Sequence, residues 1–156
     1  MKKLIIVLSI VTIIVISGFC YYKHIKNNML DVDGMIMIKE LELVINGKTF
    51  LLELDDNEAV STLVNKLKDG DISIFLSQYG GFEYVGNLNF SLPTSDRRIT
   101  TEPGDVVLYQ GNQLVVFYGS NTWEYTKIGH INYNDINGLE SVFGEDNVEI
   151  VLKLTK

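Results

Sequence analysis

The stretch EPGDVVLYQGNQLVVFYGSNTWEYTKIGHI, residues 102–131, decides the fold. Residues 105–109 and 113–117 are two short runs in which apolar side chains occupy both alternate faces, and Gly111-Asn112 separates them. A strand that is apolar on both faces is covered on both sides. These runs therefore predict a deeply buried hairpin, and the alternating residues 123–132 predict a further strand.

The sequence on either side of this stretch adds more short strands and two helices. Residues 41–45 and 50–54 alternate in hydrophobicity around Asn46-Gly47, which predicts a hairpin with a two-residue turn. Residues 55–70 carry an apolar stripe after Asp55, a candidate helix cap. About eight strands and two short helices predict a mainly β fold, a closed antiparallel barrel. The remaining expected elements are a helix at 134–144 and strands at 71–76, 82–85, 97–100 and 147–154.

Length and charge limit the possible organisation and partners. Once an apolar leader is subtracted, the chain has room for one domain of about 115 to 120 residues. The charge is +2 over residues 1–38 and −9 over residues 39–156. An acidic domain repels phosphate backbones, because nucleic-acid affinity comes largely from lysine and arginine. Nucleic acid is therefore not an expected partner.

Cysteine and histidine are too few for the usual metal and disulfide sites. The single cysteine, Cys20, lies at the end of the leader, so the domain can form neither an internal disulfide nor a cysteine-based zinc site. His130 is the one histidine within the domain. We therefore expect no metal and no cofactor.

Residues 1–26 are interpreted as a transmembrane anchor or a signal segment. Two lysines precede an apolar run, and residues 4–22 approach the roughly 20 residues that cross a bilayer as a helix. Tyr21 and Tyr22 suit the membrane interface. The alternatives are a signal peptide cleaved after Cys20 and a lipoprotein signal, although Phe19 stands where such signals carry a small residue.

The order of these segments predicts an exported domain. Residues 27–38 are interpreted as a tether that leads into the barrel domain at residues 39–156. The short amino-terminal flank favours a single-pass protein of the cell membrane with an extracytoplasmic carboxyl-terminal domain. A secreted domain, released by cleavage of the leader, is the second choice.

The run EPGDVVLYQGNQLVVFYGS, followed by the pattern W-x-Y-T-K-x-G at residues 123–129, resembles the bacterial cyclophilin-like fold proteins. The resemblance extends over residues 40–154 and implies an eight-stranded cyclophilin-type barrel with two helices. Such proteins are similar in fold to prolyl isomerases, but a fold hosts many functions. The function has to be argued from individual residues.

True cyclophilins carry the motif F-H-R-I-I-x-x-F-M-x-Q-G-G-D, whose arginine polarises the prolyl amide. The nearest local match is FLSQYGG, residues 75–81, and Gly70 stands at the arginine position. The resemblance therefore does not imply classical isomerase activity.

Four residues are predicted to bind a ligand: Tyr84, Arg97, Trp123 and Tyr125. Trp123 and Tyr125 alternate after a loop and suit the rim of a barrel mouth, where they would line an aromatic cleft. Arg97 belongs to an arginine pair that can hold a carboxylate or phosphate, or can form a surface ion pair. His130 has no partner within its own motif and is expected at a strand end. Catalytic residues are not assigned.

Three functions remain open at this stage. The leading hypothesis is a membrane-tethered domain that binds a small ligand or a peptide in an aromatic cleft. The second is a divergent prolyl isomerase for exported proteins, in which Arg97 supplies the donor. The third is a structural module that engages a partner protein at the cell envelope.

Overall fold

The computed structural model describes residues 29–32, 35–132, 136, 139–144 and 147–155. The chain divides into two compact units, the longer of which spans Glu40–Thr155. In the shorter unit, β1 (Met29–Val32) and β2 (Met35–Ile38) form an antiparallel hairpin within the segment interpreted as a tether. The expected leader, residues 1–26, lies outside the described residues. Among the helices that the structure does describe, none is both long and apolar enough for a membrane span.

The longer unit begins with the expected hairpin. Strand β3 (Glu40–Ile45) pairs with β4 (Lys48–Leu54) in antiparallel register, with Leu43 opposite Phe50. The two turn residues, Asn46 and Gly47, both have positive φ, at 47° and 80°. Positive φ at both central positions matches the right-handed twist of the strands, which explains why an Asn-Gly pair reverses the chain here.

Helix α2 (Glu58–Leu67) has a different cap from the expected one. The cap is Asn57, whose Oδ1 accepts a hydrogen bond from the backbone N–H of Val60 at 3.0 Å. The prediction of Asp55 is wrong because the backbone N–H of Asp55 donates to the carbonyl of Ile128 at 2.9 Å. That bond keeps residue 55 with the sheet, so the helix can begin only after the chain has left the strand.

The remaining elements follow the order that the sequence predicts, with small shifts at their ends. They are β5 (Ile72–Tyr79), β6 (Glu83–Asn87), β7 (Arg97–Thr100), β8 (Asp105–Tyr109), β9 (Gln113–Phe117), β10 (Thr122–Ile131), α3 (Leu139–Phe143) and β11 (Asn147–Leu154).

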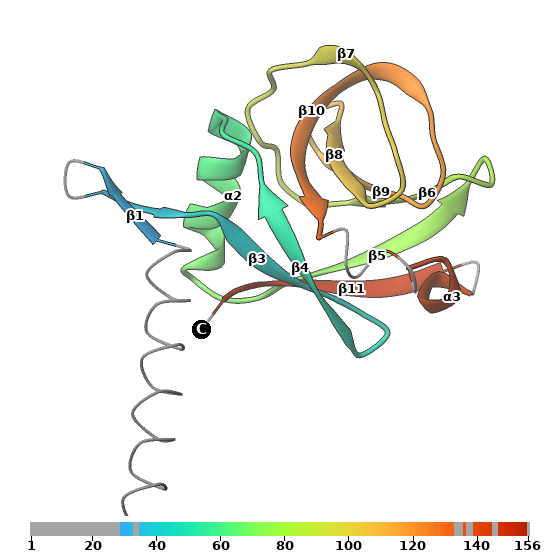
Figure 1. The fold of residues 1–156 in the computed structure, drawn as a ribbon, viewed down its shortest axis with the longest axis horizontal. Helices are drawn as coiled ribbons and strands as arrows, with labels where there is room; N and C mark the ends of the chain where they lie inside the picture. Colours follow the sequence, from blue (N-terminus) through green and yellow to red (C-terminus); the bar gives the residue numbers. More distant parts are fainter. Residues whose placement is uncertain (1–28, 33–34, 133–135, 137–138, 145–146, 156) are drawn as a thin grey trace, which may run out of the picture. The chain divides into compact units, whose positions relative to one another are not determined.

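Eight of these strands close into an antiparallel barrel, which confirms the expected fold class. Their order is β4-β3-β11-β5-β6-β9-β8-β10, and β10 pairs again with β4 (Figure 1). The closing contact places Gly129 and Ile131 of β10 opposite Leu54 and Leu52 of β4. Because the barrel is closed, each of its strands has a hydrogen-bonded neighbour on both edges along at least part of its length.

Strand β10 takes part in more than the barrel. Its carboxyl-terminal half pairs with β8 and β4, whereas residues 122–125 pair with β7. In Figure 1, β7 and the first half of β10 arch away from the barrel on the side of β8 and β9. Strand β7 and the first half of β10 therefore form a second layer over part of the outer surface of the barrel.

The two faces of the sheet are distinguished at β5. Ile74 and Leu76 are buried in the barrel, whereas Phe75 and Tyr79, on the alternate face, are exposed. Residues directly opposite each other on paired strands share a face. The interior face is closely filled by aliphatic and aromatic side chains, including Leu41, Leu43, Ile45, Phe50, Leu52, Leu114, Val116, Ile150 and Leu152.

Strands β8 and β9 are buried on both faces, as their sequence predicts. Val106, Leu108, Leu114 and Val116 lie on the interior face. The outer face carries a second hydrophobic cluster formed by Val107, Val115, Phe117 and Tyr125. Tyr125 comes from the arching half of β10, so the second layer is what covers the outer face of the hairpin.

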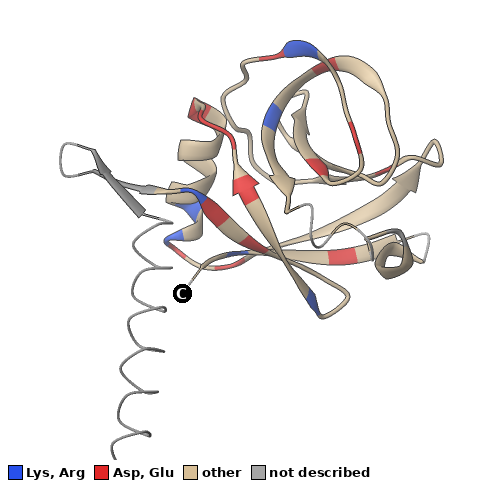
Figure 2. Cartoon of the chain, viewed as in Figure 1, with Lys and Arg blue, Asp and Glu red and all other residues tan. Residues whose placement is uncertain are grey.

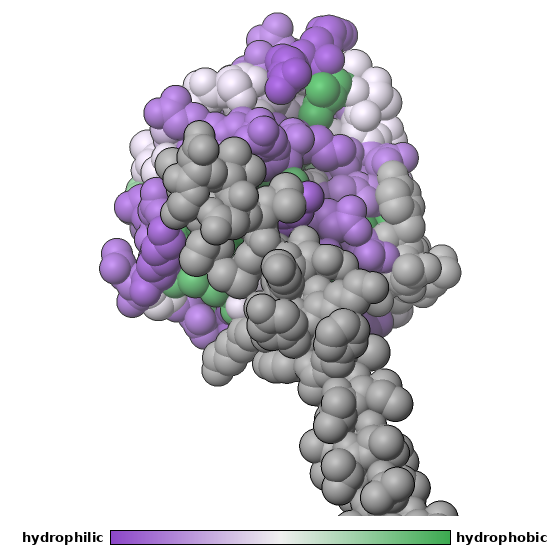
Figure 3. Space-filling view, turned by 60° about the vertical axis from the view of Figure 1, so that its left-hand side comes forward, coloured by the Kyte–Doolittle hydropathy of each residue, from purple (hydrophilic) through white to green (hydrophobic). Residues whose placement is uncertain are grey.

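Charged and polar residues cover most of the outside of the barrel. Figure 2 shows acidic residues spread over several strands, whereas Arg97-Arg98 forms a basic stretch at the start of β7. On the face seen in Figure 3, hydrophilic residues dominate the described surface. The large hydrophobic side chains exposed among the described residues are Phe75, Tyr79 and Trp123.

Substitution of Gly129 by alanine tests the closing seam. A Cβ atom at this position would collide with the backbone carbonyl of Glu53 on β4. We expect Gly129→Ala to lower the free energy of unfolding of the full-length chain by about 2 kcal/mol or more, measured by urea denaturation. The control is Gly144→Ala, whose Cβ would meet only ordinary van der Waals contacts. Equal stability of the two variants would contradict the close pairing of β10 with β4 at Gly129.

Candidate functional site

A cleft with a volume of about 260 Å³ opens on the outer face of the barrel. Strands β5, β6, β8 and β9 contribute its floor and one wall, and the arching half of β10 contributes the other wall. Four aromatic side chains dominate it. The described residues that line it are Tyr79, Glu83, Val85, Tyr109, Gln113, Val115, Asn121, Trp123 and Tyr125.

The register of the strands brings the floor residues to one face. Tyr79 lies opposite Glu83, and Val85 lies opposite Val115. Tyr109 lies opposite Gln113 on the next pair of strands. Because Tyr79 is exposed on the outside of β5, all of these side chains lie outside the barrel. The cleft is consequently separate from the filled barrel interior.

Hydrogen bonds and ring contacts hold the wall formed by β10. The Nδ2 of Asn121 donates to the hydroxyl of Tyr125 at 3.0 Å. The Tyr125 ring packs edge-on against Tyr109 and Phe117, with centroid distances of 5.9 and 5.7 Å. Tyr125 is thus fixed against the floor, whereas Trp123, two residues before it, is 53% exposed at the mouth of the cleft.

Glu83 is the unusual residue of this cleft. It is only 7% exposed, and its Oε2 is buried with no hydrogen-bond partner among the described residues. Burial raises the pKa of its carboxyl from 4.5 to about 7, because removal from water penalises the charged form. Burial, and then the negative charge of Glu83, also raise the pKa of Tyr125. A carboxyl that titrates near neutral pH in a cleft is typical of a functional site.

The structure brings together two of the four residues that the sequence predicts as ligand-binding. Trp123 and Tyr125 line the cleft, although on the outer face and not at a barrel mouth. Tyr84 lies on the opposite face of β6, where its ring stacks on Phe143 of α3 at 4.3 Å. Arg97 is exposed on β7 and does not line the cleft among the described residues.

Sequence reasoning missed Glu83, Tyr79, Tyr109 and Asn121. In the sequence, Glu83 has the pattern of a solvent-facing charge on an alternating strand. A signal for its burial did exist, because residues 105–109 and 113–117 are apolar on both faces. Another segment therefore had to cover the outer face of that hairpin. In the structure this segment is the first half of β10, and it also buries Glu83 on the neighbouring strand β6.

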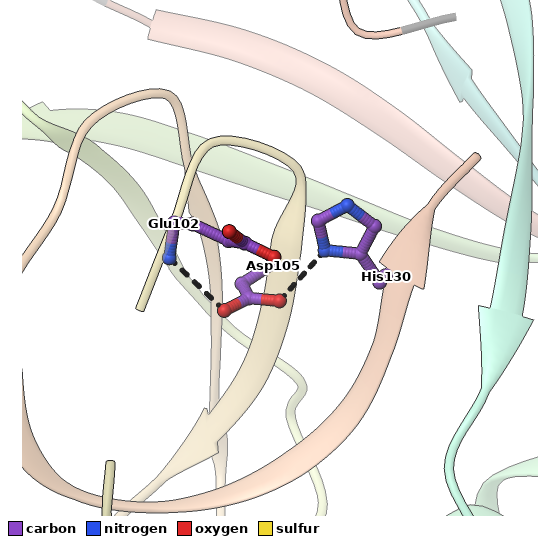
Figure 4. Close-up of side chains that lie close together, drawn as sticks. All are labelled: Glu102, Asp105 and His130. Atoms are coloured by element: carbon purple, nitrogen blue, oxygen red, sulfur yellow. Dashed lines mark hydrogen bonds and ion pairs between the residues drawn. The ribbon is translucent and has the colours of Figure 1, made fainter. Parts of the chain in front are cut away.

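A second cluster surrounds Asp105, a buried residue at the start of β8. Figure 4 shows its carboxylate between Glu102 and His130. Its Oδ1 lies 2.8 Å from both the Nδ1 of His130 and the Nζ of Lys127. Its Oδ2 accepts a hydrogen bond from the backbone N–H of Glu102 at 3.1 Å. His130 lies near a strand end, as expected, but its carboxylate partner comes from outside its own motif.

A β-bulge in β10 lets Lys127 and His130 reach the same carboxylate. The register shifts between Lys127 and Gly129, where β10 passes β8. One extra residue in a strand reverses the alternation of faces beyond it. Side chains three positions apart, which would point to opposite faces in a regular strand, therefore share the outer face.

The cluster has the ligand types of a metal site, but its charges favour another interpretation. Glu102, Asp105 and His130 each offer one ligand atom, and these atoms lie within 4.8 Å of one another. The lysine ammonium on Asp105 would repel a divalent cation at that oxygen. We interpret the cluster as a charge-compensated clamp that fastens the start of β8 to the end of β10.

Sequence comparison assigns the family of the chain. A sequence model described as the cyclophilin-like family matches residues 43–153. The chain belongs to the cyclophilin-like family. This assignment confirms the expected resemblance to cyclophilin-like proteins, and the match includes all or part of every strand of the barrel. No curated protein matches the sequence significantly.

Two solved structures are similar to this cyclophilin-like barrel. The solution structure of the hypothetical protein AF2241 from Archaeoglobus fulgidus has a TM-score of 0.56 and 16% identity, covering 75% of this chain and 95% of that chain. The structure of McbB in complex with tryptophan has a TM-score of 0.53 and 15% identity, covering 74% of this chain and 44% of that one. The chain thus spans less than half of the length of the McbB chain. At these identities, both comparisons support the fold alone.

The titration of Glu83 predicts a pH dependence of stability. Between pH 4.5 and about 7 the folded state keeps a proton that the unfolded state has lost, so the free energy of unfolding falls as pH rises. The shift corresponds to about 3 kcal/mol, and screening by water in the open cleft reduces it to about 2 kcal/mol. Between pH 4.5 and 8, the free energy of unfolding of the wild-type chain should fall by this amount relative to that of the Glu83→Gln variant. Urea denaturation at each pH measures the difference.

The control for this experiment is Glu149→Gln, which alters an exposed glutamate on β11. Its stability should follow that of the wild-type chain across the same pH range. A Glu83→Gln variant that also follows the wild-type chain would show that Glu83 is solvated in the folded protein.

The clamp predicts unequal losses at two aspartates. Asp105→Asn leaves Lys127 without its buried counterion, so we expect a loss of about 2 to 3 kcal/mol in the free energy of unfolding. Asp71→Asn removes an exposed ion pair to Lys153, with N and O atoms 3.3 Å apart, and should cost less than about 1 kcal/mol. Urea denaturation of both variants tests the difference, and similar small losses would rule out the clamp.

Proposed function

We propose that the cyclophilin-like domain binds a small molecule carrying an aromatic ring in the outer-face cleft. The observation that carries this proposal is the lining itself, in which Tyr79, Tyr109, Trp123 and Tyr125 surround a volume of about 260 Å³. Clefts lined by aromatic side chains with a few placed polar groups are the usual form of small-molecule sites. Aromatic rings pack edge-on or offset against other rings, which favours an aromatic ligand.

The size of the cleft favours a small molecule over a peptide. A volume of about 260 Å³ lies near the lower limit of ligand pockets. It accommodates one ring with a short substituent, or a single side chain of a peptide. McbB, of whose chain 44% matches this fold, is described in complex with tryptophan, but the proposal depends on the side chains of this chain.

We place this activity outside the cytoplasm, on a domain tethered to the cell membrane. This part of the proposal rests on the sequence of residues 4–22, with its apolar run and flanking lysines and tyrosines. The acidic charge of residues 39–156 fits a domain that stays in solution beside the membrane.

The isomerase alternative has less support at this cleft. A prolyl isomerase needs a donor that polarises the amide beside an apolar seat. Amide groups are present at Gln113 and Asn121, but the described lining contains no arginine. The Nδ2 of Asn121 is already committed to Tyr125. Arg97, which was expected to supply the donor, lies elsewhere on β7.

The test is a titration with 2-phenylethanol, a neutral molecule of one ring and a two-carbon arm. Trp123 is the only tryptophan of the sequence, so the intrinsic fluorescence of the full-length chain reports directly on the cleft. We expect saturable binding that Tyr79→Ala weakens about fivefold or more, because removal of one aromatic contact costs about 1 kcal/mol.

The matched control is Phe75→Ala. Phe75 and Tyr79 are both exposed aromatic residues on the outer face of β5, at 73% and 66%, but only Tyr79 lines the cleft. Phe75→Ala should therefore leave the affinity unchanged. Equal effects of the two substitutions would place the binding site elsewhere on β5. A lack of binding by aromatic probes of every charge would overturn the proposed function.

A further inference from the structure

The lining of the cleft is strongly asymmetric in charge. Glu83 is its one charged side chain among the described residues, and no lysine, arginine or histidine is present there. The other polar groups are the amides of Gln113 and Asn121 and the tyrosine hydroxyls. An anionic ligand would therefore meet a carboxyl group and no positive charge.

The two buried acids of the barrel differ in their partners. Asp105 has an ammonium, an imidazole and a backbone N–H around its carboxylate. The Oε2 of Glu83 has no partner among the described residues. Buried polar atoms in folded proteins almost always have a partner, so a buried carboxyl group without one needs an explanation. Because Glu83 also lines the cleft, a ligand group that binds its carboxyl is one such explanation.

From this geometry we propose that the natural ligand carries a protonated nitrogen on a short arm beside its ring, and that this nitrogen binds the Glu83 carboxylate. The inference rests on the proposed function and specifies its ligand class, an aromatic amine of cationic charge. Tyr79, Tyr109, Trp123 and Tyr125 surround the ring.

Two interactions favour such a cation. A hydrogen bond between an ammonium and a carboxylate is about twice as strong as one between neutral groups. Aromatic faces also attract a nearby cation through their quadrupoles, and tryptophan and tyrosine are the most effective in this role. Both effects are stronger beside a glutamate that is only 7% exposed than they are in open water, because fewer water molecules surround the charges.

Protonation of Glu83 must then oppose binding of the cation. The titratable groups facing Glu83 from the strands packed against it are phenols, on Tyr79 of β5, Tyr109 of β8 and Tyr125 of β10, whereas β9 contributes none. The phenol of Tyr125 stays neutral below pH 8, because burial and the charge of Glu83 raise its pKa above the ordinary value of 10.0. Glu83, whose pKa burial raises to about 7, changes its charge between pH 6 and 8.

The experiment compares three probes that share a ring and a two-carbon arm. They are phenethylamine, 2-phenylethanol and 3-phenylpropanoate, which are cationic, neutral and anionic at pH 8. Each is titrated into the full-length chain, with Trp123 fluorescence as the readout. We expect phenethylamine to bind at least about tenfold more tightly than 2-phenylethanol, and 3-phenylpropanoate to bind most weakly.

Two further measurements assign this preference to Glu83. The Glu83→Gln variant should bind phenethylamine about fivefold or more weakly than the wild-type chain. Its affinity for 2-phenylethanol should be unchanged, which would show that the cleft is still folded. In the wild-type chain, lowering the pH from 8 to 6 should weaken phenethylamine by about fivefold or more and leave 2-phenylethanol unchanged.

The control variant is Glu124→Gln. Glu124 lies between the two cleft aromatics of β10 but is exposed and does not line the cleft. It should leave the charge preference intact, which separates a direct contact from the general effect of an acidic surface.

The outcomes distinguish the two proposals. If 2-phenylethanol binds but phenethylamine binds no more tightly, or if Glu83→Gln keeps the preference for the amine, the inference is overturned and the proposed function stands. If none of the three probes binds, the proposed function falls and the inference falls with it.

Discussion

The ten-residue strand β10 pairs with three other strands along different parts of its length, and the rest of the structure depends on this division. Its second half bonds to β8 and β4, which closes the barrel. Its first half bonds to β7, which holds Tyr125 above the outer face of β8 and β9. One strand thus contributes both to the closed scaffold and to the covered surface outside it.

This arrangement explains why the cleft lies outside the barrel. Among the described residues, buried side chains of the barrel strands fill the interior, whereas the cleft lies on the outer face. The second layer covers the outer face only as far as the aromatic contacts of Tyr125 with Tyr109 and Phe117. Beyond these contacts, the two layers diverge toward exposed Trp123 and Tyr79, and a cleft remains between them.

The two buried acids show how similar residues serve different purposes. Asp105 is surrounded by compensating groups, so its burial contributes to fastening β8 to β10. Glu83 is buried without a cation, and its raised pKa shows that the fold disfavours its charge. A destabilising group that no structural contact explains is typical of functional sites. The presence of compensating groups at Asp105 and their absence at Glu83, among the described residues, are the reasons for interpreting the first as a clamp and the second as part of a ligand site.

The sequence by itself determined the succession of strands and helices along the chain, the Asn46-Gly47 hairpin, the two-sided burial of residues 105–109 and 113–117, and the family. These features depend on local turn chemistry and on hydrophobic period, which neighbouring residues encode. Only the tertiary structure decided which face of each strand is covered, and hence that Glu83 is buried and that Tyr84 lies away from the cleft. The bulge that brings Lys127 and His130 to the same side as Asp105 could not be predicted either. A prediction from alternation assumes that every second residue shares a face, and the extra residue of a bulge breaks that rule.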